Sequence, residues 1–319
     1  MYITLFIIIS LLLIGFLYEQ YARYKAKAYK IEGDFIDVGG HKLHYLKKGN
    51  GKATIVFESG ADFGGHIVWR NIQNKLSKNF STLSYDKAGV LHSQRGEKPK
   101  TCASMAEDLH ILLEKLDLPK PYILVGHSLA GLTLRSFVDK YPQNIAGVVL
   151  LDPSHPDVLD NYPPKTRKKY TTIPPKWLLT ILLNVGVVRL TFLKLIDKFA
   201  PNALASEKEN FKEAVDQIHK GFEAYREEFT NWEKLSNETK GIEFTNLPIV
   251  VLGAIKPTFD TPEDHDGVRV MNEFHLKTVE RSLKGKYIAV DCPHTIQFEK
   301  PDLVVEVVEE LAKEVLKKQ

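Results

Sequence analysis

The amino-acid sequence predicts an α/β protein with a mostly parallel, doubly wound sheet, an inserted helical lid and an N-terminal transmembrane helix. Apolar segments alternate with helical patterns, and strands that are continuously apolar are typical of a parallel sheet covered on both faces. Residues 153–246 interrupt this alternation with a Lys-rich, Pro-rich and amphipathic helical pattern, which predicts the lid. The uncharged segment at residues 2–18 predicts the transmembrane helix.

The N-terminal segment is near the lower length limit for a helix that spans a bilayer. No Lys or Arg precedes it and bulky residues occupy positions 16–18, which favours an uncleaved anchor over a signal peptide; a core helix is the third alternative. Four basic residues follow: Arg23, Lys25, Lys27 and Lys30. The positive-inside rule then predicts a single-pass protein of the cell membrane with a cytoplasmic domain, against the alternative of a secreted or extracytoplasmic one. Residues 1–30 are the expected anchor and basic linker.

The elements of the core are predicted over residues 31–152 and 247–319. Residues 34–46 indicate a hairpin, because the glycines at its centre accept positive φ. The expected strands that follow are residues 53–58, 80–85, 121–125, 145–151, 247–252 and 287–290. The expected helices of the core are residues 68–77, 103–116, 129–140, about 268–284 and 301–317.

Inside the lid, residues 176–199 and 207–232 look helical. Two Pro-Pro pairs break the chain before them. Residues 177–195 are strongly apolar but contain Asn184 and Arg189, which favours a pair of lid helices over a second membrane span.

Charge and cysteine content exclude several kinds of partner. The 43 basic and 40 acidic residues are spread along the chain and give a net charge of +3, so no field that attracts nucleic acid is expected. Cys102 and Cys292 lie in unrelated segments without a Cys-x-x-Cys spacing, which indicates neither a disulfide framework nor a zinc site. We expect no metal and no cofactor, and the oligomeric state is open.

Residues 125–131, VGHSLAG, follow a predicted strand and precede a predicted helix. A G-x-S-x-G turn is so tight that the residues around its serine must be small, and it exposes the hydroxyl at the edge of the sheet. Ala130 replaces the last glycine of that pattern and is still small. The strand-turn-helix context therefore favours Ser128 as a nucleophile over a serine in a structural turn.

A serine nucleophile needs a base and a pair of oxyanion donors. His294 follows the last predicted strand and precedes the last helix, so its loop is expected at the same sheet edge as Ser128. The backbone N–H of Leu129, directly after the serine, is the first expected donor. Ala61, in the glycine-rich segment ESGADFGG, is the second, against the alternative that this loop has no catalytic task.

These motifs, in this order, resemble the α/β-hydrolase superfamily over about residues 34–317. The resemblance is carried by ESGADFGG as the oxyanion loop, GHSLAG as the nucleophile elbow and the late histidine in PHTIQFEKP. The segment YDKAGVLHS also looks like the Asp-Arg-x-Gly-x-Gly-x-Ser loop of many members, with Lys87 and Leu91 in place of the usual Arg and Gly. The resemblance implies the α/β-hydrolase fold and is less specific for the substrate.

The acid of the triad is ambiguous, because most members carry it after the strand that follows the lid, where this chain has Lys256. Some members instead place the acid at the end of the strand before the lid, which is the position of Asp152. Asp260 is the alternative acid, since a longer loop would let it reach the histidine. Asp264 and Asp266 are further candidates.

The sequence therefore predicts a serine hydrolase that cleaves carboxylic esters through an acyl-enzyme. A serine nucleophile excludes the aspartate-based dehalogenase and epoxide-hydrolase chemistries of the superfamily. The apolar lid and the anchor suggest a lipid-like or acyl substrate, with a small-molecule acyl compound and the membrane as the expected partners. The alternatives are an amidase, lactonase, C–C hydrolase or cofactor-free peroxidase on the same fold, and a non-catalytic membrane-tethered binding protein.

Overall fold

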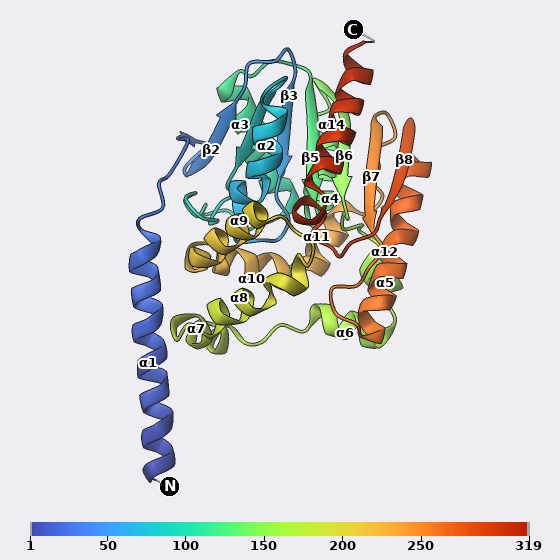
Figure 1. The fold of residues 1–319 in the computed structure, drawn as a ribbon. Helices are drawn as coiled ribbons and strands as arrows, with labels where there is room; N and C mark the ends of the chain where they lie inside the picture. The colour runs from blue at the N-terminus through green and yellow to red at the C-terminus, as the bar shows by residue number, and fades with distance from the viewer. Residues whose placement is uncertain (1, 318–319) are drawn as a thin grey trace.

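The computed structural model describes residues 2–317 and contains an eight-stranded sheet (Figure 1). Its order is β1-β2-β4-β3-β5-β6-β7-β8, with β1 and β2 antiparallel to their neighbours and the other pairs parallel. The strands are β1 (Asp34–Asp37), β2 (Lys42–Lys48), β3 (Thr54–Glu58), β4 (Ser81–Tyr85), β5 (Tyr122–His127), β6 (Ile145–Leu151), β7 (Pro248–Ala254) and β8 (Lys284–Val290). The predicted hairpin and mostly parallel sheet are confirmed.

Helices cover both faces of the sheet because the central strands are apolar on both. In β3, Ile55 and Phe57 pack toward one core cluster, and Val56, which points the other way, packs toward a second. The first cluster includes residues of α14 and the second includes residues of α3 and α4. The helices around the sheet are η1 (Gly65–Trp69), α2 (Arg70–Leu76), α3 (Cys102–Leu116), α4 (Ala130–Lys140), α12 (Pro262–Glu280), α13 (Ile296–Glu299) and α14 (Pro301–Leu316).

The segment between β6 and β7 is helical and lies across one end of the sheet (Figure 1). It contains α5 (Val158–Asn161), α6 (Pro164–Thr171), α7 (Lys176–Asn184), α8 (Val187–Phe199), α9 (Ala205–Asp216), η2 (Ile218–Lys220), α10 (Phe222–Thr230) and α11 (Trp232–Thr239). Residues of this segment line a cavity together with residues at the carboxyl ends of β5 and β6. In an open parallel sheet this is the end at which ligands bind.

Three predicted helices differ most from the helices that the structure contains. The helix predicted over residues 176–199 is two helices bent by 80°, because Gly186 takes a φ of +75° between them. The helix predicted over residues 207–232 is interrupted by η2 and by the turns on either side of α10. Helix α12 begins at Pro262, earlier than predicted, because the Thr261 side chain accepts a hydrogen bond from the Asp264 N–H and Pro262 suits the first turn.

The N-terminal part of helix α1 (Tyr2–Ala26) extends away from the rest of the molecule, and its later turns pass beside α7 (Figure 1). Within residues 2–317 it is the one unbroken helix that is long and apolar enough to cross a membrane, a property that signal sequences near the N-terminus share. Its apolar side chains are largely exposed, so they are not part of the core of the domain.

Candidate active site

Ser128 lies on the turn between β5 and α4 with a φ of +55°. This left-handed conformation is strained for serine, and it turns the side chain out of the sheet. Gly126 makes room for the turn, because a Cβ there would lie 2.6 Å from Leu134 Cδ1 and 2.9 Å from the Ala130 Cβ. The methyl group of Ala130 therefore fits only because residue 126 is glycine.

Ser128, His294 and Asp152 form one hydrogen-bonded series. His294 Nε2 lies 2.9 Å from Ser128 Oγ, and His294 Nδ1 lies 2.5 Å from Asp152 Oδ2. The three residues come from the turn after β5, the loop after β8 and the end of β6, which are neighbouring positions at one edge of the sheet. This is the geometry in which a carboxylate orients an imidazole and the imidazole takes a proton from a hydroxyl.

Asp152 is held in place by its backbone and by a second hydrogen bond. It has a φ of +42°, and its Oδ1 accepts a hydrogen bond of 3.0 Å from the Ala254 N–H at the end of β7. Burial alone would raise the pKa of the Asp152 carboxyl, but the hydrogen bond and charge of His294 outweigh burial and hold that pKa below its ordinary value. The side chain is therefore a carboxylate at neutral pH.

The other acids considered for this role have other partners than His294. Asp260 is almost fully exposed and pairs with His265 at 2.7 Å. Lys256, in the position where many members carry the acid, pairs with Asp291 at 2.9 Å. Asp264 accepts hydrogen bonds from Lys169 and Tyr170, and Asp266 lies near Arg269. The structure brings Asp152 to His294 and leaves Asp260, Asp264 and Asp266 in other pairs.

His127, next to the serine, packs behind the turn. Its Nε2 lies 3.0 Å from the carbonyl oxygen of His294. Burial, with the nearby His294, lowers the pKa of His127 to about 3, so the ring is neutral and donates this hydrogen bond. The elbow is thereby tied to the loop that carries His294.

The expected oxyanion donors, Ala61 and Leu129, line the same cavity as Ser128. Among residues 2–317, neither backbone N–H donates to a protein acceptor, so both are available to a ligand. Gly60 permits this approach, because a Cβ there would lie 2.9 Å from the Ser128 Cβ and 3.0 Å from the His127 carbonyl oxygen. The glycine in this loop is therefore needed for close contact with the elbow.

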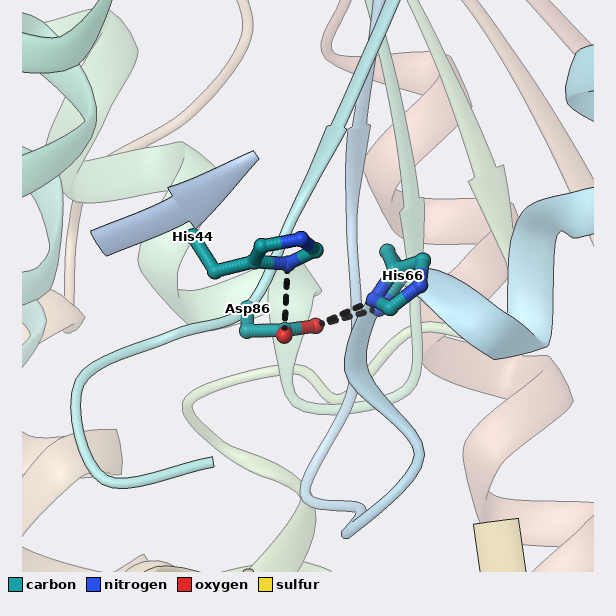
Figure 2. A group of neighbouring side chains, drawn as sticks. All are labelled: His44, His66 and Asp86. Carbon is teal, nitrogen blue, oxygen red and sulfur yellow. Dashed lines mark hydrogen bonds and ion pairs between the residues drawn. The ribbon is translucent and has the colours of Figure 1, made fainter. Parts of the chain in front are cut away.

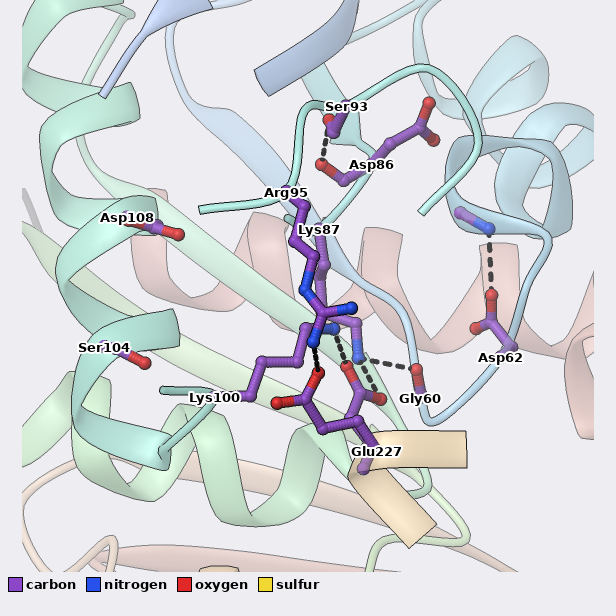
Figure 3. Close-up of polar contacts among 12 residues, drawn as sticks. Gly60, Asp62, Asp86, Lys87, Ser93, Arg95, Lys100, Ser104, Asp108 and Glu227 are labelled. Atoms are coloured by element: carbon purple, nitrogen blue, oxygen red, sulfur yellow. Dashed lines mark hydrogen bonds and ion pairs between the residues drawn. The ribbon is translucent and has the colours of Figure 1, made fainter. Parts of the chain in front are cut away.

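Three buried charged side chains, from Lys87, Lys100 and Glu228, form a hydrogen-bonded cluster beside Gly60, the residue before Ala61 (Figure 3). Lys87 Nζ donates to the Gly60 carbonyl oxygen at 2.7 Å and to Glu228 Oε2 at 2.8 Å. Lys100 Nζ donates to the other oxygen of Glu228 at 2.5 Å. Burial would lower the pKa of Lys87, but the charge of Glu228 outweighs it and keeps the ammonium protonated.

In the sequence, Lys87 stands out as a departure from the family pattern, whereas no motif marks Glu228 or Lys100. A pairing between α10 and a loop more than a hundred positions away leaves no local signal.

The cavity above Ser128 has a volume of about 270 Å³. Besides Ser128, Asp152, His294 and the loop of Ala61, its walls include three charged residues, Glu228, Lys256 and Asp264. The rest of the wall is mainly aromatic and apolar: Tyr162, Tyr170, Phe199, Phe229, Trp232, Phe259, Val268 and Met271. Most of these residues belong to α5–α11 or to α12. Such a wall favours an apolar ligand with few polar groups.

A separate cluster of His44, His66 and Asp86 has side chains of the types that bind metal ions (Figure 2). Asp86 lies between the two rings, with oxygens 2.9 Å from His44 Nδ1 and 2.8 Å from His66 Nδ1. His44 Nε2 is 2.7 Å from the Glu32 carbonyl oxygen. Asp86 therefore pairs with both rings, and the cluster joins the linker before β1 to the core.

Both nitrogens of His44 face acceptors, Asp86 and the Glu32 carbonyl, and this arrangement favours the protonated form of the ring. Burial would lower its pKa, but the hydrogen bond and charge of Asp86 raise it above the ordinary value. Because the pKa of His44 is raised in the folded state, its pairing with Asp86 stabilises the fold fully below the pKa of an unfolded histidine, about 6.5. This stabilisation is lost as the pH rises through the pKa of His44 in the folded protein.

We therefore expect His44→Gln to lower the free energy of unfolding by about 1.5–3 kcal/mol, the range for hydrogen bonds to charged groups. Denaturant unfolding of the wild type and the variant at about pH 6 and about pH 9 measures the pH dependence. The difference between the two proteins should be larger at the lower pH. A difference that grows at the higher pH would contradict a charged His44.

Comparison with known proteins places this chain in a family. The model of a family described as the alpha/beta hydrolase fold matches residues 55–301. An uncharacterized protein, YbdG, of Bacillus subtilis is 29% identical over 139 residues, a match that covers 43% of each chain. The chain thus matches less than half the length of this relative.

Solved structures of the same fold differ in activity. An epoxide hydrolase from Bacillus megaterium superimposes with a TM-score of 0.67 at 18% identity, covering 88% of this chain and 100% of that one. An enol-lactonase from Burkholderia xenovorans LB400 superimposes with a TM-score of 0.60 at 20% identity, with the same coverage. At these identities the likeness shows the fold alone. Together with the family match over most of the core, it shows that this chain belongs to the alpha/beta-hydrolase family.

Proposed function

We propose that the protein is a serine hydrolase that cleaves carboxylic esters through an acyl-enzyme. The observation that supports this most directly is the continuous series from Ser128 Oγ through His294 to Asp152, at 2.9 and 2.5 Å. A hydroxyl, an imidazole and a buried carboxylate in this order make a nucleophile, a general base and an orienting acid.

In the proposed mechanism, Ser128 Oγ attacks the ester carbonyl carbon while His294 Nε2 takes the hydroxyl proton. The oxygen of the tetrahedral intermediate accepts hydrogen bonds from the N–H groups of Ala61 and Leu129. His294 then gives its proton to the departing alkoxide, and an acyl group remains on Ser128. Water, deprotonated by His294, releases the acid and restores the hydroxyl.

The choice of an ester follows from the nucleophile and the cavity. An alkoxide leaves more readily than an amine, and a lactone is a cyclic ester open to the same steps. Attack of Ser128 on an epoxide would instead give an ether, which water does not hydrolyse, so epoxide turnover is not expected. The aromatic cavity of about 270 Å³ favours an apolar acyl group of modest size.

We further propose that α1 anchors the protein in the cell membrane with the catalytic domain on the cytoplasmic side. The basic residues that follow the apolar part of α1 support this orientation. In this proposal residues 1–30 are the anchor and linker, residues 153–246 form the lid, and the remaining residues form the catalytic core.

A panel of activated esters, amides, lactones and epoxides tests the proposed reaction. Turnover should be highest for apolar esters, and a fluorophosphonate probe should label the protein at Ser128, because such probes react with activated serines. A folded protein that is not labelled and cleaves none of these compounds would favour a binding function instead.

Lys87 offers a test of the oxyanion donors. The Gly60 carbonyl and the Ala61 N–H belong to one planar peptide group and point in opposite directions. An ammonium bonded to the carbonyl therefore orients the N–H toward the cavity and strengthens it as a donor. We expect Lys87→Met to lower kcat by about tenfold or more, somewhat less than direct loss of an oxyanion donor, with little change in KM.

Two further variants distinguish the two roles that Lys87 could have, which are to position the Gly60–Ala61 peptide group and to neutralise Glu228. Lys87→Arg keeps a charged donor near Gly60 and should restore much of the rate. Lys100→Met removes a cation from the same glutamate but makes no contact with Gly60, so it is the matched control. Equal losses in Lys87→Met and Lys100→Met would mean that Lys87 only neutralises Glu228.

A further inference from the structure

The corner formed by α7 and α8 presents apolar side chains to the outside. Trp177 is 65% exposed and Ile181 is 46% exposed, one turn apart on α7. Val187 and Leu190 are 42% and 43% exposed, one turn apart on α8. No residue of α7 is buried. Exposed apolar side chains that gather on two consecutive helices favour a site of interaction.

Helix α1 lies directly against this corner (Figure 1). Gly15 approaches Val185 so closely that a Cβ on the glycine would lie 2.6 Å from the Val185 carbonyl oxygen. A Cβ on Gly186 would lie 2.9 Å from the ring of Tyr18. Backbones that approach this closely at glycines indicate a packed helix contact rather than a loose crossing.

A buried ion pair joins the same two segments. Glu19 Oε2 accepts a hydrogen bond of 2.8 Å from Arg189 Nε, and Oε1 accepts one of 2.9 Å from Nη2. Both side chains are fully buried, and Arg23 donates to Glu19 from the next turn. The bidentate geometry fixes the rotation of α1 against α8.

The position of this contact along α1 indicates how deep the corner of α7 and α8 would lie in a bilayer that α1 crosses. Glu19 is the first charged residue after the apolar segment, so it marks the edge of the part that hydrocarbon could surround. Val185 contacts Gly15, four residues earlier, which is about 6 Å further along the helix axis. Helices that lie in a membrane interface bury their apolar face by about 5–10 Å.

We propose that the apolar corner of α7 and α8 inserts into the interface of the same phospholipid bilayer that α1 enters, so that anchor and lid form one membrane-contacting unit. This inference rests on the proposed anchoring by α1. The bilayer is the expected occupant because α1 brings it to the corner. The exposed Lys176, which adjoins Trp177 and pairs with Glu223, and the exposed Lys25 of α1 also suit anionic headgroups.

The arrangement connects the bilayer to the cavity. Helix α8 begins at the corner, and its last residue, Phe199, lines the cavity above Ser128. An apolar ester dissolved in the bilayer would therefore meet the lid at one end of α8 and the reactive serine near the other. This predicts a preference for esters that partition into membranes.

Site-specific fluorescence tests the insertion in the full-length chain reconstituted into phospholipid vesicles. Trp177→Cys carries an environment-sensitive dye on the corner. Leu283→Cys is the matched control, because Leu283 is an equally exposed apolar residue between α12 and β8, at the opposite end of the sheet. Cys102 and Cys292 are buried, and unsubstituted protein measures any labelling of them.

We expect the dye at residue 177 to shift to shorter wavelengths and to lose most of its emission when the vesicles contain lipids with a quencher on the acyl chain, while the dye at residue 283 changes little. Protein that floats with the vesicles but shows a water-like, unquenched dye at residue 177 would overturn the insertion and leave the anchor intact. A shifted but unquenched dye would mean that a second copy covers the corner. Protein that does not float with vesicles would refute the anchor itself.

A kinetic measurement adds a readout that does not depend on the dye. Ile181→Glu with Leu190→Glu places charges on the corner, outside the residues that line the cavity. The double variant should lose rate on an ester dissolved in vesicles and keep the wild-type rate on a water-soluble ester. Equal loss on both esters, or no loss on either, would contradict the inference, whereas absence of activity in the wild type would refute the proposed ester hydrolysis.

Discussion

Replacing Ser128 with alanine should lower kcat on an activated apolar ester by about 10⁴- to 10⁶-fold, the range expected when the nucleophile of a triad is removed. Alanine has no oxygen to form the acyl-enzyme, so only the oxyanion donors and the cavity remain to assist water. The measurement is steady-state hydrolysis, with fluorophosphonate labelling as an independent assay. A Ser128→Ala protein that cleaves ester at the wild-type rate would refute the proposed mechanism.

His294→Ala should cause a loss of similar size, because the base and the nucleophile act as a unit. For the same reason, the double variant of Ser128 and His294 should be little worse than either single variant. Ser128 is strained at a φ of +55°, and alanine tolerates that conformation no better, so thermal unfolding must show that the variant is folded. Losses that multiply in the double variant would indicate two independent roles.

Asp152→Asn should lower kcat by about 10⁴-fold, as expected when an amide replaces the acid of a triad. The Ala254 N–H, which donates to Asp152 Oδ1, would hold the oxygen of the asparagine amide in the same position. The NH₂ group would then face His294 Nδ1. The ring would then accept at Nδ1 and carry its proton on Nε2, the wrong tautomer to take a proton from Ser128. Asparagine also tolerates the positive φ of residue 152, so the backbone should be unchanged.

Asp260→Asn is the matched control. Asp260 was a candidate for the same role from the sequence, and it is exposed and paired with His265. This variant should hydrolyse esters at the wild-type rate. Near-normal activity in both variants would contradict Asp152 as the acid, and a large loss in Asp260→Asn alone would point to a rearranged loop in the active enzyme.

Much of the fold was predictable because the relevant signals are local. The apolar segments of the central strands, the glycines at 39 and 40, and the small residues around Ser128 each depend on backbone conformation and burial within a few residues. Ser128 and His294 could be selected on the same basis, since each directly follows a predicted strand. Thr261, before α12, carried a local signal for a helix start. Gly186 carried one for a helix break, but the lid around it offered too many comparable patterns to rank it.

The sequence by itself determined the order of the elements, the elbow at Ser128 and the loop that carries His294. Only the tertiary structure decided which carboxylate reaches the imidazole, because Asp152 and Asp260 both lie in loops at the same sheet edge and differ only in how those loops pack. The same holds for the contact of Lys87 with Gly60 and Glu228, and of Glu19 with Arg189. The physical reason is that a buried charge is tolerated only beside its partner, and such partners come together through packing of distant segments rather than through local sequence.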